Sequence, residues 1–298
     1  MSATPPANPY VGPRALRTGE ALYGRDREVA RLYDLMLAER IVLLYSPSGA
    51  GKSSLLQAGL VPRLHAEGFT IRPVVRVGMA PPTDAPAGVN RYVLSTLLSL
   101  EEDVPKDRQL DVATLARCTL AEYLARRPEA DADEVLLLDQ FEELLTVDPT
   151  AVAEKRVFFA QLGEALRDTR LWVVLAMRED FIAGLDPYRA AVPRKLSTTF
   201  RLDLLGREAA LLAVRGPAAA VGVTFEVEAA ELTYRDRAYQ NGDGFALVLG
   251  ASSGFGEALD KVATSLAMAP GCVMACGVST ASTPSTLSSA ATICSAFA

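Results

Sequence analysis

Several kinds of residue are scarce in this chain of 298 amino acids, and their scarcity excludes some classes of function. His65 is the only histidine, which excludes metal sites built from several histidines and any catalytic triad that does not use this residue. Of the four cysteines, Cys118 stands alone within a helical pattern, where a buried, unreactive thiol is expected. No run of about 18 or more strongly apolar residues occurs, so we expect no membrane-spanning helix and no membrane partner.

The charge balance and the amino terminus exclude two further classes. A formal net charge of −6 and an isoelectric point near 5.1 argue against a surface that coats nucleic acid. The first residues, MSATPPANPYVGPR, lack the layout of a signal peptide, and their prolines favour an extended backbone. With 50% apolar and 22% charged residues, we expect a soluble, cytoplasmic protein with one large or two medium domains.

The strongest motif is IVLLYSPSGAGKSSLL at residues 41–56. An apolar run at 41–45 predicts a buried parallel strand, and a helix-forming run begins at Ser54. Between them lie Ser46, Pro47, Ser48, Gly49, Ala50, Gly51, Lys52 and Ser53. This order predicts a phosphate-binding loop, whose main-chain N–H groups surround the phosphates of a nucleotide. In such a loop Lys52 contacts the β- and γ-phosphates, and the Ser53 hydroxyl ligates Mg²⁺.

One residue of this loop departs from the full pattern G-x-x-x-x-G-K-[ST], because Ser46 stands where the pattern has glycine. A serine makes this turn at modest strain, so we interpret Ser46 as a tolerated variant. The alternative is a simple Gly-Ser turn with a solvated lysine.

A second informative segment is DEVLLLDQFEELLT at residues 133–146. Its apolar residues 135–138 predict a strand that ends at Asp139, and ligands of α/β sheets bind at such carboxyl ends. Asp139 is therefore expected beside the phosphate-binding loop, where it holds Mg²⁺, and either Glu142 or Glu143 polarises the attacking water. The alternative is that Asp139 caps a helix and the glutamates form a solvated face.

Another apolar strand, LWVVLAM at 171–177, ends at Arg178. A guanidinium at this edge of the sheet can reach a γ-phosphate and report its presence. The alternative is an ion pair between Arg178 and a neighbouring carboxylate.

Apolar periodicity elsewhere predicts alternating strands and helices over residues 41–204, which favours an α/β fold with a parallel sheet and helices on both faces. We expect further strands at 70–77 and 198–204. We expect a helix in LYGRDREVARLYDLML, entered through Gly24-Arg25-Asp26, and further helices at 89–100, 112–126, 152–167 and 206–214. The last helix is expected to break at Arg215-Gly216-Pro217, and a helical pattern resumes at 228–237.

These motifs together resemble the STAND class of P-loop NTPases, specifically the bacterial novel STAND NTPase domain, which is related to AAA+ proteins. The resemblance spans about residues 8–237 and also rests on NPYVGPRAL, LYGRDREV, LAMREDF and VRGPAAAVGVTFE. It implies an ATP- and Mg²⁺-dependent switch that hydrolyses ATP slowly and self-associates to control an effector in signalling or defence. It also implies that Gly24, Arg25 and Glu28 lie against the base or ribose, that Pro217 touches adenine, and that Arg178 is a sensor arginine.

We expect four parts: an extended leader at 1–20, the NTPase domain at 21–205, a truncated helical lid at 206–238 and an irregular tail at 239–298. Within the tail, FALVLGASSGFGEAL at 245–259 resembles the coenzyme-binding turn of short-chain dehydrogenases, but no Tyr-x-x-x-Lys pair follows. No charged residue follows Lys261, so we hypothesise a tail read out of frame or from an assembly junction; the alternative is a membrane-associated or disordered tail. Two alternative functions are an NAD(P)-binding fragment and a nucleotide-binding interaction module without turnover.

Overall fold

A computed structural model describes residues 9–11, 14–126 and 133–222. These residues belong to two compact units, which are considered separately: one contains residues 27–48 and 55–202, and the other contains residues up to 26, 49–54 and those from 203. The helical pattern at 228–237, the glycine turn at 245–259 and the tail lie outside the described residues.

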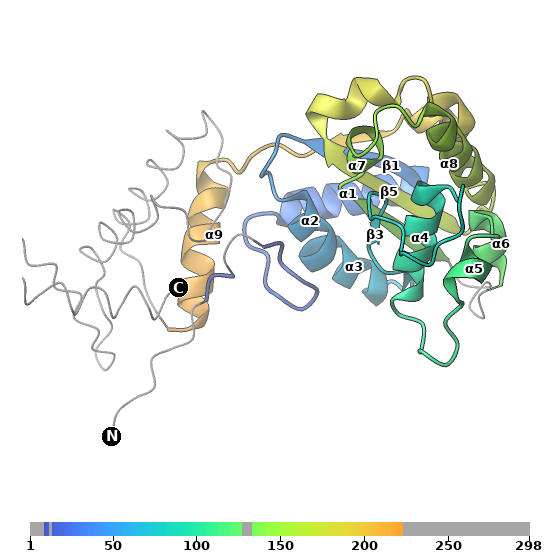
Figure 1. The fold of residues 1–298 in the computed structure, drawn as a ribbon. Coiled ribbons are helices and arrows are strands. Elements are labelled where there is room, and N and C mark those ends of the chain that lie inside the picture. Colours follow the sequence, from blue (N-terminus) through green and yellow to red (C-terminus); the bar gives the residue numbers. More distant parts are fainter. Residues whose placement is uncertain (1–8, 12–13, 127–132, 223–298) are drawn as a thin grey trace, which may run out of the picture. The chain divides into compact units, whose positions relative to one another are not determined.

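The first unit contains a parallel sheet (Figure 1). Its six described strands are β1 (Ile41–Ser46), β2 (Thr70–Ile71), β3 (Val75–Arg76), β4 (Glu134–Asp139), β5 (Leu171–Arg178) and β6 (Thr199–Arg201). Their order is β2-β4-β5-β1-β6, and β3 also pairs with β4. Every pairing among these strands is parallel, so the predicted α/β fold with a parallel sheet is confirmed.

The central strands form because their apolar runs are buried on both faces, as parallel strands require. Leu43 and Leu175, which are paired in register, belong to a core that also contains buried residues of the helices. The next residues, Leu44 and Ala176, point to the opposite face and are equally inaccessible to solvent. Both faces of the sheet are therefore covered, as predicted.

The helices of this unit match most of the predicted ones. They are α1 (Asp26–Glu39), α3 (Val61–Ala66), α4 (Arg91–Glu101), α5 (Val112–Leu115), α6 (Leu120–Ala125), α7 (Glu143–Thr146) and α8 (Val152–Ala165). Shorter turns are the π-helix η1 (Leu55–Leu60) and the 3₁₀ helices η2 (Glu179–Leu185), η3 (Arg189–Ala191) and η4 (Pro193–Leu196). Helices α4, α6 and α8 contact one another beside the sheet (Figure 1). Cys118, between α5 and α6, is buried, as its isolated position predicted.

Two predicted elements are each divided in the structure. The strand expected at 70–77 is split into β2 and β3, because Pro73 lacks the N–H that a sheet ladder needs, and Arg72 forms a buried ion pair with Glu134. The helix expected at 112–126 is split into α5 and α6. Thr119 starts α6 with a capping box, in which its hydroxyl accepts from Glu122 N and the Glu122 carboxylate accepts from Thr119 N.

The second unit contains α2 (Lys52–Ser54) and α9 (Arg207–Ala220). The predicted break at 215–217 is wrong, because α9 continues through Pro217. A proline removes one main-chain hydrogen bond, but α9 is rich in alanine and buries Ala213, Val214 and Ala218 on one side. Favourable propensity and this packing outweigh the lost bond.

Candidate nucleotide-binding site

The predicted phosphate-binding loop leaves β1 at Ser46 and ends where α2 begins at Lys52. Ser46 is buried, and its hydroxyl donates to the main-chain oxygen of Pro47 at 2.7 Å. Positive φ angles occur instead at Gly49 and Gly51, at 78° and 91°, a region that favours glycine. The backbone at Ser46 therefore does not require glycine, and the substitution leaves the order of strand, loop and helix intact.

Three of the predicted residues lie at the carboxyl edge of the sheet. Ser46 ends β1, Arg178 ends β5 and Asp139 ends β4, and Ser46 is registered opposite Arg178. Because the strands are parallel and β5 lies between β4 and β1, these residues share one edge of the sheet, as the sequence predicted.

Asp139 is almost fully buried at this edge, with 4% of its surface exposed. Its Oδ1 accepts from the main-chain N–H of Gln140 at 2.9 Å, and Gln140 has a positive φ of 51°. The chain therefore turns sharply just after the strand. The alternative in which Asp139 caps a helix is not supported, since among the described residues α7 is preceded by Glu142 and has no side-chain cap.

The two glutamates after Asp139 make different contacts. Glu142 Oε2 accepts from the main-chain N–H of Arg178, which ends β5, at 3.3 Å. Glu143 Oε1 instead binds Nη2 of Arg76, in β3, at 2.8 Å. Since β5 and β3 pair with opposite edges of β4, the two carboxylates are directed to opposite sides of that strand.

Phe141 fixes the backbone that carries these glutamates. Its side chain is fully buried, and its ring lies 5.8 Å from the ring of Phe159 and 6.2 Å from that of Phe158, both in α8. Its main-chain N–H donates to Ala176 O of β5 at 2.9 Å. The acidic segment is therefore anchored to the sheet and to α8, which limits how far Glu142 can move.

The Arg178 side chain forms the ion pair that the sequence left as an alternative. Its Nε and Nη2 donate to Oδ2 of Asp180 at 3.2 and 2.6 Å, and its guanidinium lies 5.5 Å from the centre of the Phe181 ring. The side chains of Arg178 and Asp180 are 43% and 56% exposed. The pair is thus open to solvent at the edge of the sheet.

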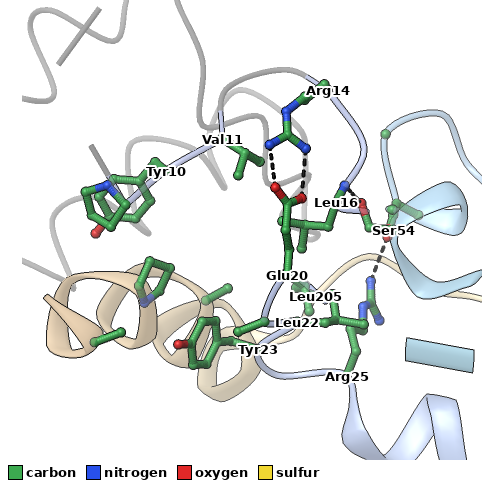
Figure 2. Close-up of a pocket in the computed structure, with 18 of the residues that line it drawn as sticks. Tyr10, Val11, Arg14, Leu16, Glu20, Leu22, Tyr23, Arg25, Ser54 and Leu205 are labelled. Carbon is green, nitrogen blue, oxygen red and sulfur yellow. Dashed lines mark hydrogen bonds and ion pairs between the residues drawn. The ribbon is translucent and has the colours of Figure 1, made fainter. Parts of the chain in front are cut away.

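The other unit contains a pocket of about 390 Å³ (Figure 2). Its wall is assembled from three stretches of the chain: the segment before α1, the phosphate-binding loop, and α9 with Leu205 before it and Val221 after it. The lining residues are Pro9, Tyr10, Val11, Arg14, Leu16, Glu20, Ala21, Leu22, Tyr23, Arg25, Gly49, Ala50, Gly51, Ser54, Leu205, Ala213, Pro217, Ala220 and Val221. Most of these side chains are apolar, as in sites for small ligands.

The predicted residues Arg25 and Pro217 line this pocket, whereas Glu28 is not among its lining residues. Arg25 is buried and its Nη2 donates to the main-chain oxygens of Ala50 and Asp203 at 2.9 and 2.8 Å. Gly24 has a φ of 76°, and a Cβ there would lie 2.4 Å from Ala209 O of α9. Gly24 therefore allows close packing against α9 and does not itself line the pocket.

Residues 14–23 contribute a wall that the sequence did not predict, since we expected only an extended leader up to residue 20. Arg14 and Glu20 form two parallel bonds, from Nη1 to Oε2 at 2.8 Å and from Nη2 to Oε1 at 2.5 Å (Figure 2). Leu16 N donates to Ser54 Oγ at 3.1 Å. Hydrogen bonds from two residues lower the pKa of Glu20 to about 2: the larger effect comes from the Arg14 side chain and the smaller from the main-chain N–H of Arg17. The Arg14–Glu20 pair therefore stays charged to strongly acidic pH.

Two tyrosines contact α9, Tyr23 within this wall and Tyr10 before it. The Tyr10 hydroxyl donates to Val214 O at 2.7 Å, and burial raises the pKa of this hydroxyl. A Cβ on Gly216 would lie only 2.3 Å from the ring of Tyr23, so glycine is needed for their contact. The sequence signal for the first part of this region was the segment NPYVGPRAL, which carried the family resemblance but was interpreted only as a leader.

Comparisons with solved structures agree with this fold. A Walker-type ATPase of Pyrococcus abyssi matches with a TM-score of 0.54 and 15% identity, over 84% of this chain and 70% of that one. The ORC1 protein of Aeropyrum pernix, in complex with DNA, matches with 0.50 and 16%, over 82% and 60%. The ADP form of the ORC2 protein of Aeropyrum pernix matches with 0.51 and 18%, over 78% and 61%. At these identities the likeness shows a shared fold.

Comparison with known families is more specific. No curated protein matches this sequence. Residues 9–249, however, match the family described as Novel STAND NTPase 1, and this range includes the phosphate-binding loop, Asp139, Arg178 and the pocket. None of the helices in the described part of the chain is long and apolar enough to cross a membrane. Because the family match spans residues 9–249, the chain belongs to the novel STAND NTPase family, and it contains a nucleotide-binding P-loop NTPase domain.

Proposed function

We propose that this domain is a switch that binds ATP with Mg²⁺, hydrolyses it slowly and self-associates to control an effector in signalling or defence. The observation that supports this most directly is the sheet edge, where Asp139 ends β4 and Arg178 ends β5, the strand beside β1. Glu142, three residues after β4, accepts a hydrogen bond from Arg178 N. Strand β1 leads into the loop that carries Lys52 and Ser53. Phosphoryl transfer needs mainly this kind of positioning and charge neutralisation.

In this proposal the loop at 46–54 binds the phosphates, with Lys52 on the β- and γ-phosphates, and Mg²⁺ is held by Ser53 and Asp139. A hydroxyl and a carboxylate are the oxygen ligands that Mg²⁺ prefers. Over the described residues no group of three or more His, Cys, Asp or Glu side chains forms a metal cluster. Mg²⁺ usually keeps several waters and binds phosphate oxygens; when bound, it would neutralise charge on the phosphates.

Of the two glutamates, we assign the polarisation of water to Glu142. Glu143 is paired with the guanidinium of Arg76 on the β3 side, so its carboxylate is already engaged in an ion pair. Glu142 receives a main-chain N–H from β5, the strand between β4 and β1, and is directed toward the side of the sheet from which the loop departs. Glu143 then has a supporting role, in fastening β3 to the acidic segment.

The Arg178–Asp180 pair is compatible with a sensor role for Arg178. Ion pairs this exposed stabilise proteins by only about 0–1 kcal/mol. A γ-phosphate offers the guanidinium a charge-assisted, two-point contact of greater strength. The guanidinium can therefore move from Asp180 to the phosphate at small cost, and its position would report which nucleotide is bound.

The proposal is tested on the full chain by calorimetry with ATP–Mg²⁺ and ADP and by release of inorganic phosphate. Lys52→Ala should weaken ATP binding about 10- to 150-fold, because a charge-assisted contact worth about 1.5–3 kcal/mol is lost. Lys106→Ala, in an exposed loop, is the matched control and should bind as the parent does. Unchanged binding in Lys52→Ala would refute the site. ATP binding without phosphate release would favour the alternative of a nucleotide-binding interaction module without turnover. Binding of NADPH but not of ATP would favour the NAD(P)-binding alternative.

A further inference from the structure

Residues 14–23, here called the strap, form one wall of the pocket without helix or strand structure. No sheet ladder holds the strap in place, so hydrogen bonds that involve side chains hold it instead. The Arg14–Glu20 pair closes a loop of the chain. The main-chain N–H of Arg17 also donates to Glu20 Oε2 within this loop, at 2.7 Å. Leu16 N is bonded to Ser54 Oγ, one residue after Ser53 (Figure 2).

The strap presents apolar groups to the pocket. Leu16, Leu22 and Tyr23 line it from the strap, and Leu205 and Pro217 line it from the segment at α9. A flat, largely apolar ring system suits such walls, whereas phosphates require charge and N–H donors. Arg14 and Glu20 neutralise each other and so offer no net charge to a phosphate. The glycines of the phosphate-binding loop line the same pocket and supply the phosphate end.

We propose that the Arg14–Glu20 pair is a positioning pair, which holds the strap against the nucleoside part of the nucleotide and so slows nucleotide release. This inference rests on the proposed nucleotide site. The arginine fork suits the task because two parallel bonds to one carboxylate fix both distance and orientation. When the pair is broken, the strap keeps its apolar residues but loses the contact that closes its loop, and the nucleoside leaves more readily.

The test measures dissociation of fluorescent ATP and ADP analogues by stopped flow, and affinity for inorganic tripolyphosphate, on the full chain. Arg14→Ala and Glu20→Gln should each speed release of both nucleotides about three- to tenfold and leave tripolyphosphate binding unchanged. The exchanged pair, Arg14→Glu with Glu20→Arg, should recover most of the slow release. Arg167→Ala is the matched control, because it removes a similarly short ion pair to Glu164 on an exposed helix end, 2.9 Å apart.

Three results would overturn the inference: parental release rates in both single variants, equal weakening of tripolyphosphate binding, or no recovery in the exchanged pair. Equal weakening would show that the whole fold had loosened, and unfolding midpoints without nucleotide check this directly. Failure of the proposed function is distinguishable, because the parent chain would then bind neither ATP nor tripolyphosphate. High salt gives a second readout: it screens an exposed pair, so the difference between parent and Arg14→Ala should narrow.

Discussion

The sheet edge and the pocket are built in different ways. At the edge, Asp139 and Arg178 are the last residues of buried strands and are held by main-chain pairing, and Glu142 follows three residues after Asp139. In the pocket, the walls come from segments far apart in sequence, and they are joined by side-chain bonds such as Tyr10–Val214 and Leu16–Ser54. In the proposed function the sheet edge carries the chemistry and the pocket carries nucleotide recognition. Substitutions should separate the two: those at the edge should change turnover, and those in the pocket should change binding.

The largest expected effect lies at the edge. Glu142→Gln keeps the shape of the side chain and the hydrogen bond from Arg178 N, but it removes the charge that we propose polarises water. Phosphate release should fall about 10²- to 10⁴-fold, the usual contribution of a general base, with ATP affinity within about twofold of the parent. Single-turnover phosphate release and calorimetry measure the two quantities. A variant that loses binding and turnover in proportion would contradict the proposed separation.

Glu143→Gln is the natural comparison, because it is the same change at the adjacent residue. It should reduce phosphate release far less than Glu142→Gln does, since Glu143 is engaged with Arg76. It should instead lower stability by about 1 kcal/mol or less, the value of a partly exposed ion pair. If Glu143→Gln abolished turnover and Glu142→Gln did not, the assignment of the two glutamates would be reversed.

The next largest effect is expected in the pocket. Gly216→Ala places a methyl group where the ring of Tyr23 now lies, 2.3 Å away, so the tyrosine must move. Overpacking of this kind costs about 1–3 kcal/mol, and we expect this cost to weaken the affinity for ATP and ADP alike by roughly 5- to 150-fold. Turnover at saturating ATP should stay near that of the parent. Gly206→Ala, where no atom lies within 4 Å, is the control; equal losses in both would rule out a local cause.

The same contrast explains how much the sequence could predict. Strands β1, β4 and β5 were evident because burial on both faces demands continuous apolar residues, and the edge residues follow each strand directly. Pro73 and the Thr119 capping box divided two elements that apolar periodicity alone joins. The pocket wall was missed because the Arg14–Glu20 pair and the Gly216–Tyr23 contact depend on tertiary packing, which no local pattern records.

Helix α9 shows a related limit. Proline was given its usual weight as a helix breaker at 217, yet the buried alanines of α9 keep the helix continuous. The nucleotide-contacting and catalytic roles of individual residues, and the boundaries expected at 20, 205 and 238, stay predictions.

A smaller effect is expected from the sensor pair. Asp180→Asn removes the partner that holds Arg178 and makes the guanidinium more available to a γ-phosphate. ATP affinity should rise by up to about fivefold, because breaking an exposed ion pair costs up to about 1 kcal/mol and the variant no longer has this cost. ADP affinity should stay constant. When Asp180→Asn is added to an Arg178→Ala variant, the ATP affinity should not change. Equal tightening of ATP and ADP would show that Asp180 acts by general repulsion and not through Arg178.

The smallest functional effect is expected from Lys155, a buried residue of α8 whose Nζ lies 3.5 Å from Leu145 O at α7. Burial lowers the pKa of this lysine, so its charge opposes folding at neutral pH. Lys155→Met should raise the free energy of unfolding by roughly 1 kcal/mol in urea titrations, with unchanged nucleotide binding. The pKa of Lys155 is lower in the folded chain than in the unfolded chain. Between the folded pKa and about 10.5, the unfolded chain therefore holds more protons at this lysine than the folded chain does, and the stability of the parent rises with pH. The stability advantage of Lys155→Met should shrink over this range. A loss of phosphate release in Lys155→Met would instead make this lysine a support for the sheet edge, and the edge would then depend on a side chain in the way the pocket does.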